Sequence, residues 1–212
     1  LVTGNTGILG STLMKLGNKY NVLEFIPFST KSNPRDILDR ACCSDALVGI
    51  DLVVHLASIL DYKNASQNEY KRINVDGTKI ICEEALKNNI QNFIYISSQN
   101  IYDNSKLPVN GFKENSPKRP ITLYAKSKLA AEIQLKKLGV KKLLILRPSN
   151  IIGDRLHTNS LFYGLIQNII NENKIYIYGQ GKRIYDFIAA IDICKIIIRA
   201  INHNWHGIYN LG

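Results

Sequence analysis

A glycine-spaced turn near the first residue most constrains what this chain can fold into. The first ten residues read LVTGNTGILG, an apolar stub followed by Gly4, Gly7 and Gly10 at three-residue spacing. The amphipathic run 11–16 comes next, so a strand, a turn and a helix follow in order. Glycines here permit positive φ and let backbone approach a pyrophosphate at the helix N-terminus. The spacing differs from the G-x-G-x-x-G fingerprint, and turns with three glycines also occur without a cofactor.

Short apolar runs alternate with helical patterns along the rest of the 212 residues, of which 45% are hydrophobic. Alternation of this kind predicts an α/β fold, a doubly wound parallel sheet of the Rossmann type with right-handed crossovers. The predicted strands are Val22 to Phe28, Leu52 to Leu56, Phe93 to Ile96 and Leu143 to Leu146, and the predicted helices are Val75 to Asn88 and Leu123 to Leu138.

A tyrosine and a lysine at helical spacing suggest chemistry. Tyr124 and Lys128 lie four residues apart, so a helix puts both side chains on one face, where the ammonium charge favours the phenolate. The strand-like run upstream ends in Ser97 and Ser98, and a serine hydroxyl can hold a substrate oxygen. With 11 tyrosines and 27 basic residues, chance also supplies such a pair.

Together with the glycine turn, this pattern resembles the extended short-chain dehydrogenase/reductase family, in its NAD-dependent epimerase/dehydratase branch of sugar-modifying enzymes. The resemblance covers the whole chain in seven ordered segments. They are Asp36-Ile37, the strand Asp51 to Ser58, Asn74-Val75-Asp76-Gly77-Thr78, the strand Ile94 to Ser98 with Ile101-Tyr102, Tyr124 to Lys128, Arg147-Pro148-Ser149-Asn150, and Asp186-Phe187-Ile188 with Asp192.

The resemblance implies a role for each matching residue. The catalytic trio is Ser98, Tyr124 and Lys128, and the substrate-binding residues are Ser98, Asn150 and Arg183. The implied cofactor-binding residues are Gly4, Asn5, Gly7, Ile8, Leu9, Gly10, Lys31, Asp36, Ile37, Leu56, Ala57, Ser58, Asn74, Tyr124, Lys128 and Pro148. No metal site is expected.

The implied reaction is hydride transfer at a hydroxy or keto sugar linked to a nucleotide, by an epimerase or a reductase. Sugar 4,6-dehydratases of the family carry two carboxylates after the active-site hydroxyl, whereas this chain has Gln99 and Asn100. Amides do not exchange the required proton, which argues against dehydration. A non-catalytic NAD(P)-binding sensor or scaffold is the alternative, although such relatives typically lose the catalytic tyrosine or lysine.

Two positions bear on the ligands. The second predicted strand ends without an acidic residue, and Lys31 beside two hydroxyl residues suits a 2′-phosphate, which favours NADP over NAD; a plain solvated loop lysine is the alternative. Many relatives have an arginine directly before Asp-Phe that clamps a pyrophosphate, but here Tyr185 stands there. Arg183, two residues earlier, would point to the same side of an extended segment.

Domain organisation follows from the same resemblance. Residues 1–148 are expected to form the dinucleotide-binding domain and residues 149–212 part of a substrate-binding region, with the chain truncated at both ends. The loop from Asp103 to Pro120 is expected to border the substrate. The helices after Asn74 and around Tyr124 form a homodimer interface in many relatives, so a homodimer is a possible assembly.

Composition limits the partners and the location. The net charge of +10 would attract phosphates, but the lysines are scattered, which favours a bias of the source over nucleic-acid binding. The most hydrophobic run, residues 188–201, is interrupted by charged residues, so no membrane-spanning helix is expected. Four cysteines lack metal spacing and are too few for a disulfide scaffold, which predicts reduced thiols and a cytoplasmic protein.

Overall fold

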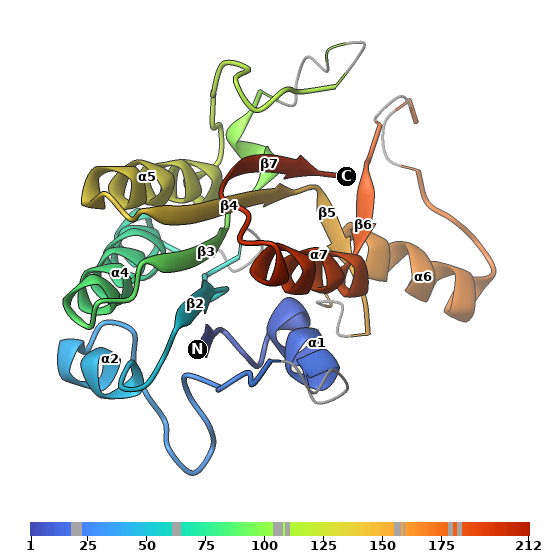
Figure 1. The fold of residues 1–212 in the computed structure, drawn as a ribbon. Coiled ribbons are helices and arrows are strands. Elements are labelled where there is room, and N and C mark those ends of the chain that lie inside the picture. The colour runs from blue at the N-terminus through green and yellow to red at the C-terminus, as the bar shows by residue number, and fades with distance from the viewer. Residues whose placement is uncertain are drawn as a thin grey trace.

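The main sheet has five parallel strands with helices on both faces (Figure 1). The computed structural model describes residues 1–17, 23–60, 65–103, 108, 111–154, 158, 160–177, 180–181 and 184–212. The strand order is β1-β2-β3-β4-β7. The strands span Val2–Thr3 (β1), Leu52–His55 (β2), Asn92–Ile96 (β3), Lys142–Pro148 (β4) and Gly207–Leu211 (β7), so the predicted parallel α/β fold is confirmed.

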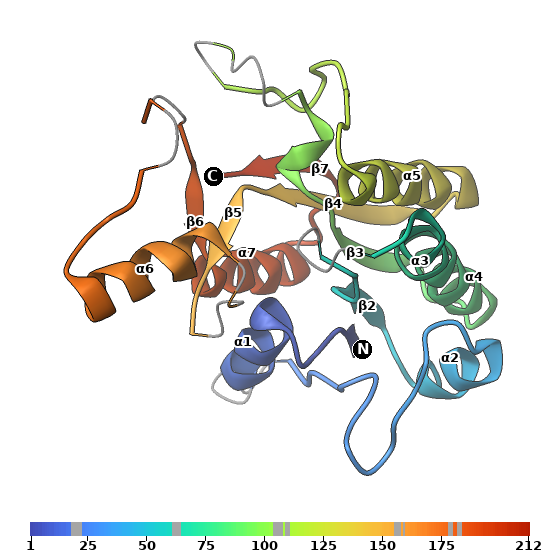
Figure 2. The ribbon, with the colours of Figure 1, turned by 180° about the vertical axis from the view of Figure 1, so that it is seen from behind.

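Two layers of helices cover the sheet, as the opposite views in Figures 1 and 2 show. One layer is formed by α2, α4 and α5, and the other by α1 and α7. The helical segments span Ile8–Gly17 (α1), Arg40–Ala46 (α2), Gln67–Tyr70 (α3), Lys71–Gly77 (η2), Thr78–Lys87 (α4), Gln99–Ile101 (η3), Leu123–Leu138 (α5), Leu161–Glu172 (α6) and Ala190–Asn202 (α7).

Neighbouring residues of a strand pack into the hydrophobic cores on opposite sides of the sheet, because successive side chains of a strand point to opposite faces. In β3, Phe93 and Tyr95 are buried with α2, α4 and α5, whereas Ile94 and Ile96 are buried with α1 and α7. Both faces of the strands are therefore covered, which explains why they read as continuous apolar runs.

The predicted strand Val22 to Phe28 is mostly wrong. Its only β-bridge in the described residues joins Val2 to Pro27, and Val22 lies outside the described residues. Val2 still donates to Ile26 O at 2.8 Å, and Phe28 donates back to Val2 O at 2.8 Å. The segment thus lies beside β1, and Pro27 is tolerated there because the two hydrogen bonds to Val2 use the neighbouring residues and not the nitrogen of Pro27.

The predicted helix 75–88 begins eight residues earlier than expected. Ser66 accepts a hydrogen bond from the Glu69 amide, and the Glu69 carboxylate accepts one from the Ser66 amide, which is a capping box. From there α3, η2 and α4 run on without a break to Lys87. The predicted helix 123–138 has the bounds of α5, which starts at the N-cap Thr122 and stops at Gly139 in a left-handed conformation.

The segment after residue 148 divides between two places. A small parallel sheet pairs β5 (Asn150–Ile152) with β6 (Phe187–Ala189), and α6 lies beside it at the edge of the molecule (Figure 1). In contrast, α7 packs on α1 and β7 pairs with β4, so both belong to the main sheet and its helical layer. The expected boundary at residue 148 stays a prediction.

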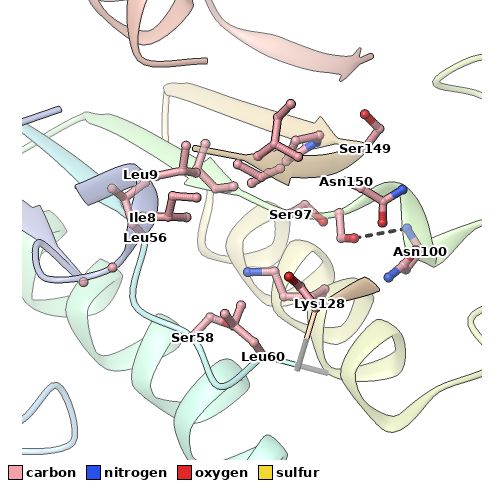
Figure 3. Close-up of a pocket in the computed structure, with 18 of the residues that line it drawn as sticks. Ile8, Leu9, Leu56, Ser58, Leu60, Ser97, Asn100, Lys128, Ser149 and Asn150 are labelled. Carbon is pink, nitrogen blue, oxygen red and sulfur yellow. Dashed lines mark hydrogen bonds between the residues drawn. The ribbon is translucent and has the colours of Figure 1, made fainter. Parts of the chain in front are cut away.

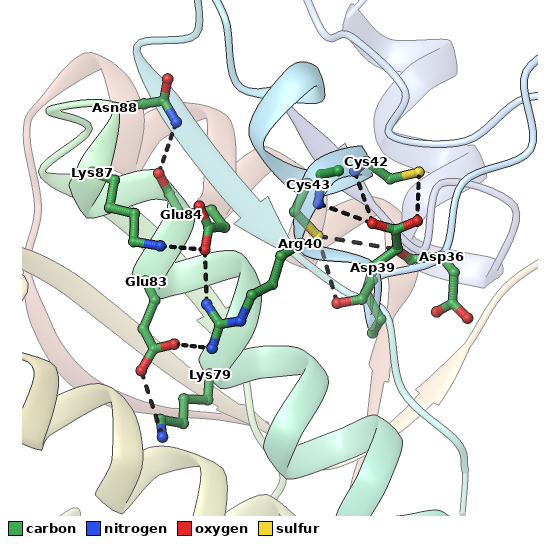
Figure 4. A network of polar contacts seen from close by, with 12 residues as sticks. Asp36, Asp39, Arg40, Cys42, Cys43, Lys79, Glu83, Glu84, Lys87 and Asn88 are labelled. Atoms are coloured by element: carbon green, nitrogen blue, oxygen red, sulfur yellow. Dashed lines mark hydrogen bonds and ion pairs between the residues drawn. The ribbon is translucent and has the colours of Figure 1, made fainter.

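A surface network fastens α2 to α4 (Figure 4). Arg40 of α2 contacts Glu83 at 2.6 Å and Glu84 at 2.7 Å, and both carboxylates also pair with lysines of α4. Nearby, Asp39 caps α2 by accepting hydrogen bonds from Ala41 and Cys42. All four cysteines are free thiols in the structure, and Cys43, Cys82 and Cys194 are buried.

Candidate active site

A pocket of about 610 Å³ opens at the carboxyl ends of β1 to β4, where ligands bind in doubly wound sheets (Figure 3). Each strand end contributes a short stretch of chain to its wall. The stretches are the glycine turn with the start of α1, residues 56–58 and Leu60 after β2, residues 96–98 and Asn100 after β3, residues 148–152 around β5, residues 160–162, and Phe187, with Tyr124 and Lys128 from α5.

The glycine turn needs its glycines for contact as well as for conformation. Gly4 has φ of +65°, and a Cβ there would lie 2.6 Å from Ala57 N. A Cβ on Gly10 would lie 2.3 Å from Gly4 O. The turn is therefore pressed against the loop after β2 and against itself, and it leaves bare backbone and the N-terminus of α1 facing the pocket. Such a cradle fits the pyrophosphate of a dinucleotide.

Asn74 fixes the loop that follows β2 to the helix that carries Tyr124. Its side chain accepts from Ile59 N at 2.7 Å and donates to Ile59 O at 3.0 Å and to Ser127 Oγ at 2.9 Å. Ser127 in turn donates to Tyr124 O at 2.7 Å. Asn74 is buried behind the pocket wall, so it supports the pocket instead of lining it.

The predicted trio comes together in this pocket from two elements. Ser98 follows β3, whereas Tyr124 and Lys128 project from the first two turns of α5, and all three line the pocket and are buried. Ser98 Oγ accepts from Asn100 N at 3.1 Å, which keeps its proton available for another acceptor. The Tyr70 ring packs edge-on against Tyr124, with centroids 6.5 Å apart.

Lys128 is a buried lysine with a lowered pKa. Burial lowers its pKa from 10.5 to about 7, against the carboxylate of Glu132, which raises it. The Lys128 ammonium lies 4.4 Å from the centroid of the Tyr95 ring. His55 beneath it is held neutral, because burial and the Lys128 charge lower the pKa of His55 to about 3. The lysine can therefore change its protonation state near neutral pH.

A buried ion pair braces the far side of α5. Arg147 of β4 donates to both oxygens of Glu132, at 2.9 and 2.7 Å, and the two side chains are 0% and 1% exposed. Arg147 also donates to the Tyr102 hydroxyl at 2.6 Å and to Glu114 O at 3.0 Å. Sequence reasoning saw Arg147 only as part of a motif; its partner fifteen residues earlier carries no sequence signal.

Several predicted cofactor residues lie outside the pocket lining. Asn5 instead bonds Ser29 O at 2.9 Å, and Ile37 is buried in the core. Asp36 accepts from Leu38 N in a local turn, and Lys31 is exposed. Arg183 lies outside the described residues. The predicted residues that line the pocket are Gly4, Gly7, Ile8, Leu9, Gly10, Leu56, Ala57, Ser58, Ser98, Tyr124, Lys128, Pro148 and Asn150.

Sequence reasoning missed several lining residues. Ser97 and Ser149, labelled in Figure 3, have buried hydroxyls for which the described part of the chain offers no hydrogen-bond partner. The serine doublet at the end of β3 was a visible signal for Ser97. Leu60, Phe162 and Phe187 add apolar wall from segments whose approach depends on the tertiary fold.

The described residues contain neither a membrane-spanning helix nor a metal-binding cluster. None of the helices there has both the length and the apolar character to cross a membrane. No group of three or more histidine, cysteine, aspartate or glutamate side chains in that part of the chain is arranged to hold a metal ion.

Several curated relatives are dTDP-glucose 4,6-dehydratases. The chain is 27% identical to mouse dTDP-D-glucose 4,6-dehydratase, covering all of this chain and 67% of that protein. It is 26% identical to dTDP-glucose 4,6-dehydratase of Streptomyces niveus, over 92% of this chain and 60% of the relative, and 29% identical to the human enzyme over 77% and 48%. The chain thus spans about half to two thirds of these relatives.

Solved structures share the fold. UDP-glucuronic acid 4-epimerase from Bacillus cereus, in complex with NAD, superposes with a TM-score of 0.87 at 24% identity, covering 100% of this chain and 76% of that one. UDP-N-acetylglucosamine 4-epimerase from Methanobrevibacter ruminantium gives a TM-score of 0.85 at 26% identity, covering 100% and 75%.

The comparisons do not support the exclusion of 4,6-dehydratases. Dehydratases are among the similar proteins, including one from Streptomyces venezuelae with NAD bound. Gln99 Nε2 donates to Leu211 O at 3.1 Å and lies outside the pocket lining, whereas Asn100 lines the pocket. The sequence model of one family matches residues 1–212, and the chain therefore belongs to the NAD dependent epimerase/dehydratase family.

Proposed function

We propose that this chain carries the hydride-transfer site of an epimerase or reductase that acts on a nucleotide-linked sugar. The observation that supports the proposal most is the single pocket shared by the glycine turn and by Ser98, Tyr124 and Lys128. A dinucleotide cradled at the turn would extend along the strand ends toward these three side chains. The pocket volume of about 610 Å³ suits a ligand of that size.

The side chains divide the work by their positions. Tyr124 would exchange a proton with the reacting sugar oxygen, and Ser98, with its hydroxyl proton available, would donate a hydrogen bond to the same oxygen. Lys128 in its charged form would favour the phenolate of Tyr124. When bound, a nicotinamide dinucleotide supplies the hydride acceptor or donor.

The rest of the pocket would hold the two ligands. Gly4, Gly7 and Gly10 with the α1 N-terminus would bind the pyrophosphate of the cofactor, and Pro148 would border the nicotinamide. Asn150, just beyond β4, would contact the sugar nucleotide. Either NAD or NADP could be the cofactor: similar structures contain NAD, whereas the exposed Lys31 is the reason to keep NADP.

Replacing Tyr124 with Phe in the complete protein tests the proposal. The change removes the proton-exchanging hydroxyl, so turnover should fall by about 10²- to 10⁴-fold while the dissociation constant of the cofactor stays nearly the same. Tyr209→Phe is the matched control, because the Tyr209 hydroxyl bonds only His206 O in the described residues and lies outside the pocket. Unchanged turnover in Tyr124→Phe would overturn the proposed role.

The products of a panel of nucleotide sugars and keto sugars identify the reaction. Exchange of isomers at C4 without net loss of reduced cofactor indicates an epimerase, and stoichiometric loss indicates a reductase. A 4-keto-6-deoxy product would instead show dehydration, which would contradict the finer assignment while keeping the hydride step.

A further inference from the structure

The ammonium of Lys128 rests on an aromatic face inside the core. Its Nζ lies 4.4 Å from the centroid of the Tyr95 ring, and both residues are at least 97% buried. Tyr95 belongs to β3 and Lys128 to α5, so the contact joins the sheet to the helix that carries Tyr124. A cation placed over an aromatic face is attracted by the ring quadrupole, and the attraction grows when water is excluded.

Two other titratable side chains among the described residues are electrostatically coupled to Lys128. Glu132, one helical turn further on, raises the pKa of Lys128, but both of its carboxylate oxygens already bind Arg147. His55 of β2 is neutral, because burial and the Lys128 charge lower its pKa to about 3. Tyr124, from the same helix, lines the pocket with Lys128 and is electrostatically coupled to Tyr95.

We propose that Tyr95 is a positioning residue, which holds the Lys128 ammonium beside Tyr124 through its ring face. The inference rests on the proposed function of Lys128, and it adds a residue that lies outside the pocket lining. Tyr95 sits two positions before Ser97, on the strand that ends at the pocket, so a rigid element fixes the ring.

The aromatic ring of Tyr95, and not its hydroxyl, holds the Lys128 ammonium. The Tyr95 hydroxyl is buried and has no hydrogen-bond partner among the described residues. Burial raises the pKa of Tyr95 well above its usual value, so the phenol stays neutral. A phenylalanine at this position would keep the aromatic face and remove an unsatisfied polar group, which is neutral or stabilising in a core.

Titration of Lys128 in the complete protein tests the proposal without any need for turnover. Lysine labelled with ¹³C at Cε reports the ammonium pKa by NMR, and Lys128→Met identifies the signal. Tyr95→Met keeps a similar volume but lacks the ring, so the pKa of Lys128 should fall by about one unit. Tyr95→Phe should restore the value of the unmodified protein. Phe93→Leu, in the same strand and core, is the control and should leave it unchanged.

A fluorinated phenylalanine at position 95 covers the case in which Tyr95→Met fails to fold. Fluorine withdraws electron density from the ring face with little change of shape, so the pKa of Lys128 should fall progressively with each added fluorine. A pKa that stays unchanged across this series, or that falls no further in Tyr95→Met than in Phe93→Leu, would overturn the proposal.

Turnover gives a second readout. The pH profile of kcat/KM should shift in Tyr95→Met by the same amount as the pKa of Lys128, and Tyr95→Phe should return it to the original position. If Lys128 titrates as expected while Tyr124→Phe leaves turnover intact, the proposed function fails and the contact stands. If the pKa of Lys128 does not change with the ring at position 95 while Tyr124→Phe abolishes turnover, only the proposed role of Tyr95 fails.

Discussion

One buried cation, Arg147, packs against helix α5 and another, Lys128, belongs to it, and the two are held in opposite ways. Arg147 has a carboxylate, a phenol and a backbone carbonyl within hydrogen-bond distance. Lys128 has the face of an aromatic ring, and burial lowers its pKa to about 7. The first arrangement keeps a permanent charge that fixes α5 to β4. The second leaves a charge that can be gained and lost near neutral pH, on the same helix as the tyrosine that we propose exchanges a proton.

A third cation shows what solvent does to a similar pairing. Arg40 contacts two carboxylates at distances as short as those of Arg147, but its side chain is 50% exposed (Figure 4). Water and salt screen such a pair, whereas the pair of Arg147 and Glu132 is sealed from both. The distance between the charged atoms alone therefore does not determine how much each ion pair stabilises the fold.

The largest expected effect comes from Glu132→Gln. The change leaves the Arg147 charge buried without a counter-charge, so the free energy of unfolding should fall by about 3–5 kcal/mol. Urea denaturation of the complete protein measures the loss. A fall below about 1 kcal/mol would contradict the view that this pair is structural.

Replacing both partners sharpens the same point. The double variant Arg147→Met with Glu132→Leu removes both charges from the core, so it should lose less stability than Glu132→Gln alone. The comparison uses the same urea titration. A double variant that is less stable than the single one would show that the hydrogen bonds of Arg147 to Tyr102 and Glu114 matter more than its charge.

Lys128→Met should raise the free energy of unfolding at pH 7, whereas Glu132→Gln lowers it. The folded chain releases the Lys128 proton near pH 7, whereas the unfolded chain holds it up to about pH 10.5. Between these values the unfolded state binds more protons, so the free energy of unfolding rises with pH by up to about 1.4 kcal/mol per unit. Lys128→Met lacks this slope, and it should be more stable than the parent at pH 7, with the gain vanishing toward pH 10. Equal slopes in the two proteins would refute a depressed lysine.

The smallest effect is expected from Arg40→Ala. Its loss of stability should be several-fold smaller than that of Glu132→Gln and should shrink further in high salt. The Arg40 hydrogen bond holds the pKa of Glu83 below 4.5, so this contribution is present above pH 4.5 and is lost as the pH falls through the lower value. Melting curves at two salt concentrations and two pH values would reveal any departure.

The parts of the fold that depend on local signals were predictable. The bounds of α5 follow from Thr122, Gly139 and a helical run between them, and the buried strands follow from their apolar composition. The predicted strand Val22 to Phe28 is reduced to a single bridge at Pro27 in the described residues, because strand pairing depends on contact with β1 as well as on apolar composition. The support of the site escaped prediction because it depends on contacts between distant elements: Asn74 reaches Ser127, and Tyr95 meets Lys128.

Deuterium transfer tests the central claim, that this pocket moves hydride between a nicotinamide and a sugar, most directly. The complete protein would be loaded with oxidised cofactor and mixed with UDP- and dTDP-linked hexoses deuterated at C4, and with deuterated reduced cofactor and keto sugars in parallel. With deuterated reduced cofactor and keto sugars, mass spectrometry should find the label on the sugar product, and far less of it in Tyr124→Phe. With deuterated hexoses the label should pass to the nicotinamide in a reductase and return to C4 of the inverted sugar in an epimerase. Binding of reduced cofactor and keto sugar with no deuterium reaching the sugar would contradict the claim.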